Sequence, residues 1–187
     1  MSRSLTVAEA ALQLRQGGVI AYPTEAVFGL GCDPNNETAV RQLLAIKQRP
    51  EEKGLILVAA SYGQLLPFID DAQLSQQQRD TALSQWPGPV TWLMPVKSRT
   101  PRWLTGQFDT LAVRVSAHPI VADLCAAFGG PIVSTSANLT GEPPALTGEE
   151  AMLRLGDHIQ GVVIGQTGQQ SSPSTILDAR TGKVIRA

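Results

Sequence analysis

The stretch Val19-Ile20-Ala21-Tyr22-Pro23-Thr24-Glu25-Ala26-Val27-Phe28-Gly29-Leu30 contains two short apolar runs separated by a polar break. Residues 19–22 predict a buried strand, and residues 27–30 predict a second one. The break at residues 23–25 carries a proline and two polar side chains, so it should be accessible to solvent. The stretch therefore predicts part of a buried sheet with an exposed polar segment between two strands.

Helices and short strands alternate along the rest of the chain. Thr6 opens a helix through a capping box, and the helix after the quoted stretch begins at Asn35 or Asn36 and ends at Pro50. Further strands are expected at residues 55–59, 90–94, 111–115, 132–134 and 162–164, and in a terminal hairpin of residues 175–177 with 183–185. This alternation predicts an α/β (α+β) layered fold, in which helices flank a twisted mixed sheet of parallel and antiparallel strands.

The composition is that of an ordinary globular protein. The chain of 187 residues is 43% hydrophobic and 17% charged, and we expect residues 1–187 to form a single domain. No apolar run approaches the length of a membrane span, and no secretory signal follows Met1, which predicts a cytoplasmic protein. Cys32 and Cys125 are isolated in the sequence, so we expect reduced thiols and no metal site.

The net charge favours no general attraction to nucleic acid. The chain has 15 Lys and Arg against 16 Asp and Glu, so any such attraction must come from local clusters. The clusters are Arg41, Lys47, Arg49 and Lys53, and then Lys97, Arg99 and Arg102 beside Trp103. A solvated loop is the simpler interpretation of the second cluster.

Two short polar strings carry most of the chemical information. The first is Lys47-Gln48-Arg49-Pro50, which offers two fixed cations. The second is Ser134-Thr135-Ser136-Ala137-Asn138, which follows an apolar run and offers small hydroxyl and amide groups. A polyphosphate needs both kinds of group, because charge grips it and hydrogen bonds orient it. The two strings together predict an anion and nucleotide site.

The local geometry of each string is compatible with that site. On a continuous helix, residues two apart point about 200° away from each other. The residue before a proline is pushed out of the helical region, so Arg49 should leave the helix and turn toward the same ligand as Lys47. In an extended chain residues two apart share a face, which aligns Ser134, Ser136 and Asn138. The alternatives are a helix end whose dipole the cations complement and an ordinary serine and threonine turn.

Several familiar sites are missing from the sequence. It contains no GxxxxGK[ST] loop, no GxGxxG fingerprint, no HExxH pair and no GxSxG elbow. His118 begins a predicted helix and His158 lies in a polar stretch, so surface positions are the simpler interpretation of both. The carboxylates lack the paired spacing of a metal site, and Mg²⁺ is expected to arrive with the nucleotide.

These residues resemble the YrdC/TsaC family of threonylcarbamoyl-AMP synthases, in its short bacterial form. The segments that carry the resemblance are Ala21-Tyr22-Pro23-Thr24-Glu25, Phe28-Gly29-Leu30-Gly31, Lys47-Gln48-Arg49-Pro50, Trp86-Pro87-Gly88-Pro89-Val90-Thr91, Val113-Arg114-Val115, Ser134-Thr135-Ser136-Ala137-Asn138 and Pro173-Ser174-Thr175. Two positions depart from the family's longer members: Ala26 stands where Thr is usual, and Gly54 where Pro is usual. These departures concern the placement of threonine and leave the reaction class unchanged.

The resemblance implies a YrdC-like layered fold, a reaction and a set of site residues. L-threonine, bicarbonate and ATP would be joined into L-threonylcarbamoyl-AMP with release of pyrophosphate, and tRNA-modification proteins would pass the threonylcarbamoyl group to the adenosine beside the anticodon. Lys47 and Arg49 would be catalytic, because they stabilise charge on the phosphoryl oxygens. The implied substrate-binding residues are Thr24, Arg114, Ser134 and Ser174. The implied nucleotide-binding residues are Lys47, Arg49, Thr110, Ser136, Asn138 and Arg186.

Two other functions stay open at the level of sequence. The clustered cations would suit a protein that binds double-stranded RNA or tRNA and acts in ribosome or tRNA maturation. The chain could also resemble the carbamoyl-transfer domain of hydrogenase maturation proteins, which normally lies in a much longer chain with zinc-finger and acylphosphatase parts. For Arg114, a surface salt bridge at the end of a strand is the alternative to a substrate contact.

Overall fold

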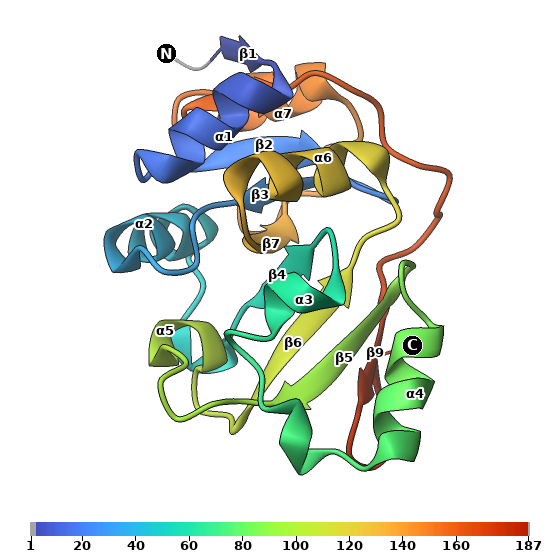
Figure 1. Cartoon of the computed structure of the whole chain (residues 1–187). Helices are drawn as coiled ribbons and strands as arrows, with labels where there is room; N and C mark the ends of the chain where they lie inside the picture. Colours follow the sequence, from blue (N-terminus) through green and yellow to red (C-terminus); the bar gives the residue numbers. More distant parts are fainter. Residues whose placement is uncertain (1–2, 187) are drawn as a thin grey trace.

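One continuous ten-stranded sheet runs through the computed structural model, which describes residues 3–186 (Figure 1). The strands are β1 (Arg3–Leu5), β2 (Ile20–Pro23), β3 (Phe28–Gly31), β4 (Ile56–Ala59), β5 (Val90–Pro95), β6 (Thr110–Val115), β7 (Ile132–Ser136), β8 (Gly161–Val163), β9 (Thr175–Asp178) and β10 (Val184–Arg186). Their order is β1-β8-β2-β3-β7-β4-β6-β5-β9-β10. The sheet contains both parallel pairs, such as β4 with β6, and antiparallel pairs, such as β4 with β7. The predicted mixed sheet is therefore confirmed.

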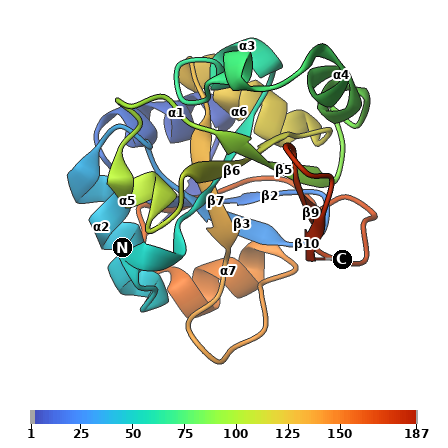
Figure 2. The same ribbon diagram turned by 90° about the horizontal axis from the view of Figure 1, so that it is seen from below.

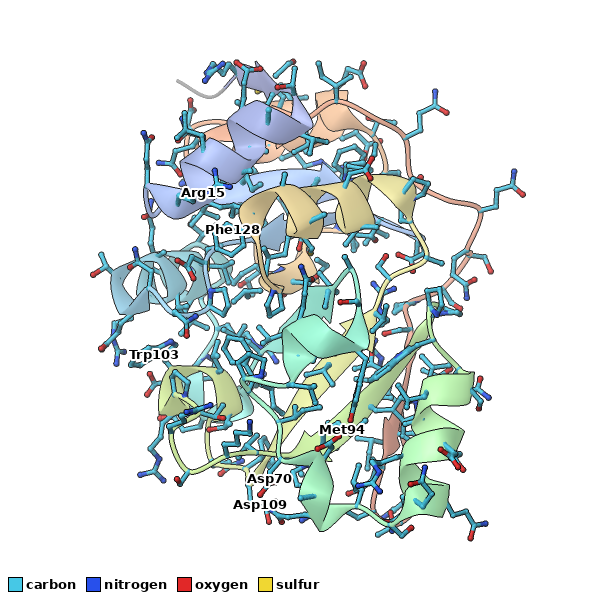
Figure 3. The ribbon with its side chains drawn as sticks, viewed as in Figure 1. Arg15, Asp70, Met94, Trp103, Asp109 and Phe128 are labelled. Atoms are coloured by element: carbon cyan, nitrogen blue, oxygen red, sulfur yellow. The ribbon has the colours of Figure 1, made fainter. Side chains whose placement is uncertain are left out.

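Helices cover both faces of this sheet. They are α1 (Val7–Arg15), α2 (Glu37–Lys47), α3 (Tyr62–Leu65), α4 (Gln76–Ser84), α5 (Arg102–Thr105), α6 (Pro119–Phe128) and α7 (Gly148–Leu155), with 3₁₀ turns at Glu51–Lys53 and Asp71–Gln73. Figure 2 shows α1 and α6 on one side of β2 and α7 on the other. Arg15 and Phe128, labelled in Figure 3, lie at the ends of α1 and α6, where the Arg15 guanidinium donates to the main-chain oxygen of Ala127. No helix within residues 3–186 is long and apolar enough to cross a bilayer.

Local sequence signals set the helix starts. Thr6 and Glu9 form a reciprocal capping box at α1, with the Glu9 N–H 3.2 Å from Thr6 Oγ1 and the Thr6 N–H 3.0 Å from Glu9 Oε1. Asn36, rather than Asn35, caps α2 through a 3.0 Å bond from the Ala39 N–H. His118 caps α6, and Pro119 occupies its first turn. These predicted starts are confirmed.

Tyr22 explains the alternating glycines of β3. Its ring lies across this strand, and its hydroxyl donates to the main-chain oxygen of Val133 in β7, 2.9 Å away. A Cβ atom placed on Gly31 would lie 2.7 Å from the Tyr22 ring and 2.4 Å from the Val133 oxygen. Since side chains cannot approach that closely, Gly31 lets β2, β3 and β7 pack around one buried aromatic ring.

Most strand boundaries differ from the sequence prediction by one residue, and several differences are larger. β1 was not predicted, because a three-residue strand has no internal periodicity and exists only through its parallel pairing with β8. β7 extends to Ser136, two residues past the predicted end, because Ser136 pairs with Gly29 of β3. The helix α2 ends at Lys47, before Pro50, for a reason given below.

The register of the strands places several of the predicted site residues on one face of the sheet. Ile56 of β4 lies opposite Ser134 of β7 and Ala112 of β6, and Val58 lies opposite Arg114. Near β2, the same face is covered by α1 and α6, where Tyr22 and Val58 pack in one apolar cluster. Beyond the ends of these helices the face is open over Ser134, and there the cavity lies.

Candidate active site

A cavity of about 310 Å³ lies on this open part of the sheet. Its lining comes from the break after β2, the turn after α2, the strands β4, β6 and β7, and the segment before β9. Of the residues predicted for the site, those in the lining are Thr24, Arg49, Arg114, Ser134, Ser136, Ser174 and Arg186. Segments that are distant in sequence therefore meet at one cavity.

Lys47 joins the two polar strings directly. Its Nζ atom lies 2.8 Å from the main-chain oxygen of Ser136 and 3.3 Å from Ser136 Oγ. It also lies 3.0 Å from the main-chain oxygen of Asn138 and 2.7 Å from Asn138 Oδ1. Four neutral oxygens thus surround one ammonium group beside the cavity. The Asn138 oxygen also accepts from Ser136 Oγ at 2.6 Å, which fixes both side chains.

The turn after α2 directs Arg49 to the cavity, although the predicted cause was wrong. Gln48, not Pro50, ends the helix, because it adopts the left-handed conformation with φ 49° and ψ 40°. The Gln48 and Arg49 N–H groups then bond back to the carbonyls of Ala45 and Leu44, as in a Schellman motif. A residue other than glycine pays about 1 kcal/mol for this conformation. The turn therefore stores strain at the point where the two cations separate.

Arg49 keeps part of its guanidinium for a ligand. Its Nε and Nη2 atoms donate to the main-chain oxygen of Gly54 at 3.2 and 3.1 Å. Burial lowers the pKa of Arg49 below its usual value, and burial together with the charge of Arg49 lowers the pKa of Lys47 to about 8. Both groups are cationic at pH 7, and their protein contacts are neutral oxygens. Their charge is therefore available to an anion.

Arg114 is held in a different way. Its Nη1 atom donates to Glu25 Oε2 and to the main-chain oxygen of Gly88 at 3.4 Å. Both side chains are largely buried, at 9% and 15% exposure, which excludes the alternative of an exposed surface pair. Burial alone would raise the pKa of Glu25, but Arg114, with hydrogen bonds from Ser116 and Ala117, outweighs it and lowers the pKa. The surroundings of Glu25 therefore favour its charged form.

The small polar residues of the site have separate surroundings. Thr24 is buried, and its hydroxyl donates to the Val27 carbonyl at 2.6 Å. Ser134 is half-buried on the open face of β7. Ser174 lies 2.7 Å, oxygen to oxygen, from Thr91, and its carbonyl accepts from Arg186 Nη2 at 2.8 Å. Burial lowers the pKa of Arg186 below its usual value.

Three predicted site residues, Lys47, Thr110 and Asn138, lie outside the cavity lining. Thr110 is buried at the first position of β6, on the same sheet face as Arg114 but four residues from it. Asn138 follows β7 and reaches the site only through Lys47 and Ser136. Lys47 itself stands at the edge, bonded to Ser136, which does line the cavity.

Residues 164–174, which we call the crossing segment, link β8 to β9 along one side of the molecule (Figure 1). The Gly168 N–H donates to the Thr24 carbonyl at 2.9 Å, and the Gln170 N–H donates to the Glu25 carbonyl at 3.1 Å. Among its later residues, Gln170, Ser172, Pro173 and Ser174 line the cavity. The crossing segment is therefore a loop that borders the cavity and is bonded to the polar break after β2.

His118 corrects the expectation of a surface histidine. It is 8% exposed, because the crossing segment covers it. Its Nδ1 atom accepts from the Ile120 N–H at 3.1 Å, so Nε2 carries the proton and donates to the Gln166 carbonyl at 2.8 Å. His158, in contrast, is exposed as expected. His118 thus fastens the crossing segment to the start of α6.

The chemistry of the cavity is that of an anion site without a built metal centre. Three arginines and one carboxylate, that of Glu25, are the charged residues in the described lining. The Glu25 oxygens are already engaged by Arg114, Ser116 and Ala117. No cluster of three metal-binding side chains exists within residues 3–186. Such a site can hold a polyanion at one end and a carboxylate at the other.

The predicted cationic clusters do not form one basic surface. Arg41 pairs with Glu37 at 2.8 Å and with Glu51 at 3.2 Å, while Lys47 faces inward. In the second cluster Arg99 and Arg102 are exposed, and the indole of Trp103 (Figure 3) donates to the Pro34 carbonyl. The second cluster is largely solvent-exposed, in agreement with the simpler interpretation, but only part of it is a loop, because Arg102 and Trp103 begin the short helix α5.

Sequence reasoning missed several residues of the site. Glu25 belongs to the polar break already identified, but its role needs the distant Arg114. Ser116 and Thr91 likewise act through partners far away in the chain. The sequence contained one hint of these residues: Glu25 is an acidic residue in a segment that was expected to be accessible to solvent.

Known proteins resemble this chain over most of its length. Residues 12–187 match the model of the Sua5/YciO/YrdC family, which carries the description "Telomere recombination". The threonylcarbamoyl-AMP synthase of Vibrio cholerae serotype O1 (strain ATCC 39541) is 58% identical over 173 residues, which cover 92% of each chain. The threonylcarbamoyl-AMP synthase of Klebsiella pneumoniae is 58% identical over 183 residues, which cover 98% of this chain and 96% of that protein.

A solved structure has the same fold. P. abyssi Sua5 in complex with L-threonine is 30% identical to this chain and superposes with a TM-score of 0.86. The match covers 95% of this chain and 54% of that one. The chain therefore spans about half the length of that structure.

Proposed function

The chain belongs to the Sua5/YciO/YrdC family and forms threonylcarbamoyl-AMP, and we propose that its cavity brings L-threonine, bicarbonate and ATP together. The observation that carries this assignment is the contact of Lys47 with Ser136 and Asn138 beside a cavity with three arginines. It joins the two polar strings into one site for a polyphosphate. The product would serve the threonylcarbamoyladenosine modification of tRNA, through further tRNA-modification proteins.

The reaction would proceed in two bond-forming steps. The threonine amine attacks bicarbonate carbon, and loss of water gives the N-carboxylated amino acid. An oxygen of the new carboxylate then attacks the α-phosphorus of ATP, and the bond to the β-phosphate oxygen breaks. The products are threonylcarbamoyl-AMP, pyrophosphate and water. Negative charge grows on the phosphoryl oxygens and the leaving pyrophosphate, so fixed cations lower the barrier.

Lys47 and Arg49 are the catalytic cations in this proposal. Their present partners are neutral oxygens, so phosphate oxygens can replace them without breaking an ion pair. Ser136 and Asn138 would orient the phosphates through the same lysine. Thr110 and Arg186 complete the proposed nucleotide contacts; Arg186 lines the cavity, and Thr110 lies outside its lining.

Arg114 is proposed to hold the carboxylate of L-threonine. Within the described chain, its hydrogen bonds to protein use Nη1, which leaves Nε and Nη2 as the parallel donors of a bidentate pair. Thr24, Ser134 and Ser174 would contact the rest of the amino acid from three sides of the cavity.

Mg²⁺ would accompany the nucleotide. The carboxylate oxygens of Glu25 are engaged by Arg114, Ser116 and Ala117, so the residues in hand do not form a site for the ion. We further propose a cytoplasmic location, where the two buried and unpaired cysteines, Cys32 and Cys125, would stay reduced.

Pyrophosphate release tests the activity. The purified protein should release pyrophosphate from ATP only when L-threonine and bicarbonate are both present, and mass spectrometry should detect threonylcarbamoyl-AMP. If neither L-threonine nor bicarbonate stimulates the release of pyrophosphate, the proposed reaction is contradicted.

Paired arginine variants test the site. Arg49→Met should raise the KM for ATP, and Arg114→Met should raise the KM for L-threonine, each by at least about tenfold. Arg99→Met, in the exposed loop, is the matched control and should change neither constant. If Arg49→Met and Arg114→Met each changed the KM for ATP and the KM for L-threonine equally, the proposal that the cavity has separate ATP and L-threonine ends would be overturned.

A further inference from the structure

We propose that Glu25 is the positioning residue of the amino-acid end, where it orients Arg114 through its side chain and the crossing segment through its main chain. This inference rests on the proposed role of Arg114. The place of Glu25 in the polar break after β2 brings it to the cavity wall. It acts on the substrate only through its neighbours.

The contacts of Glu25 leave it no chemical role of its own. Oε2 accepts from Arg114 Nη1 and from the Ala117 N–H at 3.1 Å. Oε1 accepts from the Ser116 hydroxyl at 2.9 Å. Three donors take up most of the lone-pair sites of the carboxylate, and the ion pair with Arg114 lowers its pKa, so it is poorly suited to accept a substrate proton. Its remaining function is to hold its partners.

Those contacts define the orientation of Arg114. An arginine side chain has several rotatable bonds, and a strand fixes only its Cα position. Binding at Nη1 by Glu25 and by the Gly88 carbonyl fixes one corner of the planar guanidinium. The opposite edge, Nε with Nη2, then has a fixed direction for a planar carboxylate. The substrate therefore meets a preorganised donor pair.

The main chain of Glu25 adds a second connection. Its carbonyl accepts from the Gln170 N–H at 3.1 Å, so the same residue anchors the crossing segment. Ser116 continues the connection, because its hydroxyl oxygen also accepts from the His118 N–H at 3.1 Å. His118 then holds Gln166. Arg114, the start of α6 and the crossing segment thus form one bonded unit around Glu25.

A mutant cycle with substrate-specific kinetics tests this inference. The variants are Glu25→Gln, Arg114→Met and the double variant, and Glu37→Gln is the matched control because Glu37 forms an exposed pair with Arg41. Steady-state pyrophosphate release gives the KM for L-threonine and for ATP separately. Glu25→Gln should raise the KM for L-threonine about tenfold and change the KM for ATP less than twofold. Glu37→Gln should change neither.

The double variant separates a positioning role from an independent one. If Glu25 acts through Arg114, the double variant should be no worse for L-threonine than Arg114→Met alone. Additive losses would overturn the inference. If Arg114→Met leaves the KM for L-threonine unchanged, the proposed function of Arg114 fails instead. If Arg114→Met raises it and Glu25→Gln does not, only the present inference fails.

Folding is monitored independently, because the pair is buried. Thermal melting identifies a temperature at which each variant is folded, and calorimetric titration with L-threonine is done there. Glu25→Asp keeps the charge and should retain more affinity for L-threonine than Glu25→Gln. If Glu25 had a purely structural role, the affinities of the variants would instead follow the order of their melting temperatures. A ranking by melting temperature alone would overturn the inference.

Discussion

The two ends of the cavity hold their cations by opposite means. At the lysine end, defined by Lys47, Arg49, Ser136 and Asn138, the cations contact neutral oxygens only. At the ion-pair end, defined by Glu25 and Arg114, the cation is matched by a buried carboxylate. The first end therefore keeps its net charge, and the second keeps its geometry but little net charge.

This difference fits the two proposed ligands. ATP is a polyanion whose binding gains from uncompensated charge, while L-threonine is a zwitterion that needs one carboxylate to be oriented. Burial disfavours the charged form at both ends. Together with the charge of Arg49 it lowers the pKa of Lys47 to about 8, whereas at the ion-pair end Arg114 and its neighbours outweigh burial and lower the pKa of Glu25. ATP binding at the lysine end should therefore depend on charge, whereas L-threonine binding at the ion-pair end should depend on the orientation of Arg114.

The largest effect should come from removing the lysine. Lys47→Ala should lower kcat/KM about 10³-fold, because Lys47 is proposed to stabilise the charge that develops during phosphoryl transfer. Steady-state pyrophosphate release measures it. Lys53→Ala, exposed in the next turn, is the matched control and should retain full activity. A loss below tenfold for Lys47→Ala would remove the lysine end from catalysis.

The pH dependence should be confined to the lysine end. Lys47 is charged below its pKa of about 8 and neutral above it, so the KM for ATP should rise roughly tenfold between pH 8 and pH 9 to 9.5. The triphosphate is already ionised in this range. Lys47→Arg keeps its charge throughout and should abolish this dependence in a pH series. An unchanged profile in Lys47→Arg would assign the titration to another group.

Added salt should affect ligand binding at the two ends of the cavity differently, with a smaller effect than pH. An increase in NaCl from about 0.05 to about 0.5 M should raise the KM for ATP several-fold, since it screens uncompensated charge. The KM for L-threonine should change less than twofold, because the Arg114 charge is already balanced. Steady-state kinetics measure each KM at both salt concentrations, with the other substrate held at the same degree of saturation. Parallel changes in both constants would contradict the contrast.

The smallest effect should follow loosening of the crossing segment. His118→Ala removes the bond to Gln166 and a helix cap worth about 1 kcal/mol. Hydrogen exchange should become faster at residues 164–174, and the KM for L-threonine should rise about two- to threefold with that for ATP unchanged. His158→Ala, at an exposed position, is the control. Unaltered exchange in the crossing segment would show that His118 does not hold it.

Sequence signals predicted the helix starts and most strands well, because those signals act within a few residues. The capping box of Thr6 and Glu9 and the Asn36 cap are bonds between residues three apart. The strand β1 was missed because its partner β8 lies far away in the chain. The end of α2 was misplaced because the left-handed conformation of Gln48 has no reliable signal in a residue other than glycine.

The sequence by itself determined the chemical inventory of this protein: two cations before Pro50, a row of small polar groups after a buried strand, and an arginine on another strand. Only the tertiary structure decided which groups meet. Lys47 reaches Asn138 across 91 residues, and Arg114 reaches Glu25 across 89. The order of strands in the sheet makes these contacts, whereas the alternation of side chains along a single strand says which face a residue takes but not which strand lies beside it.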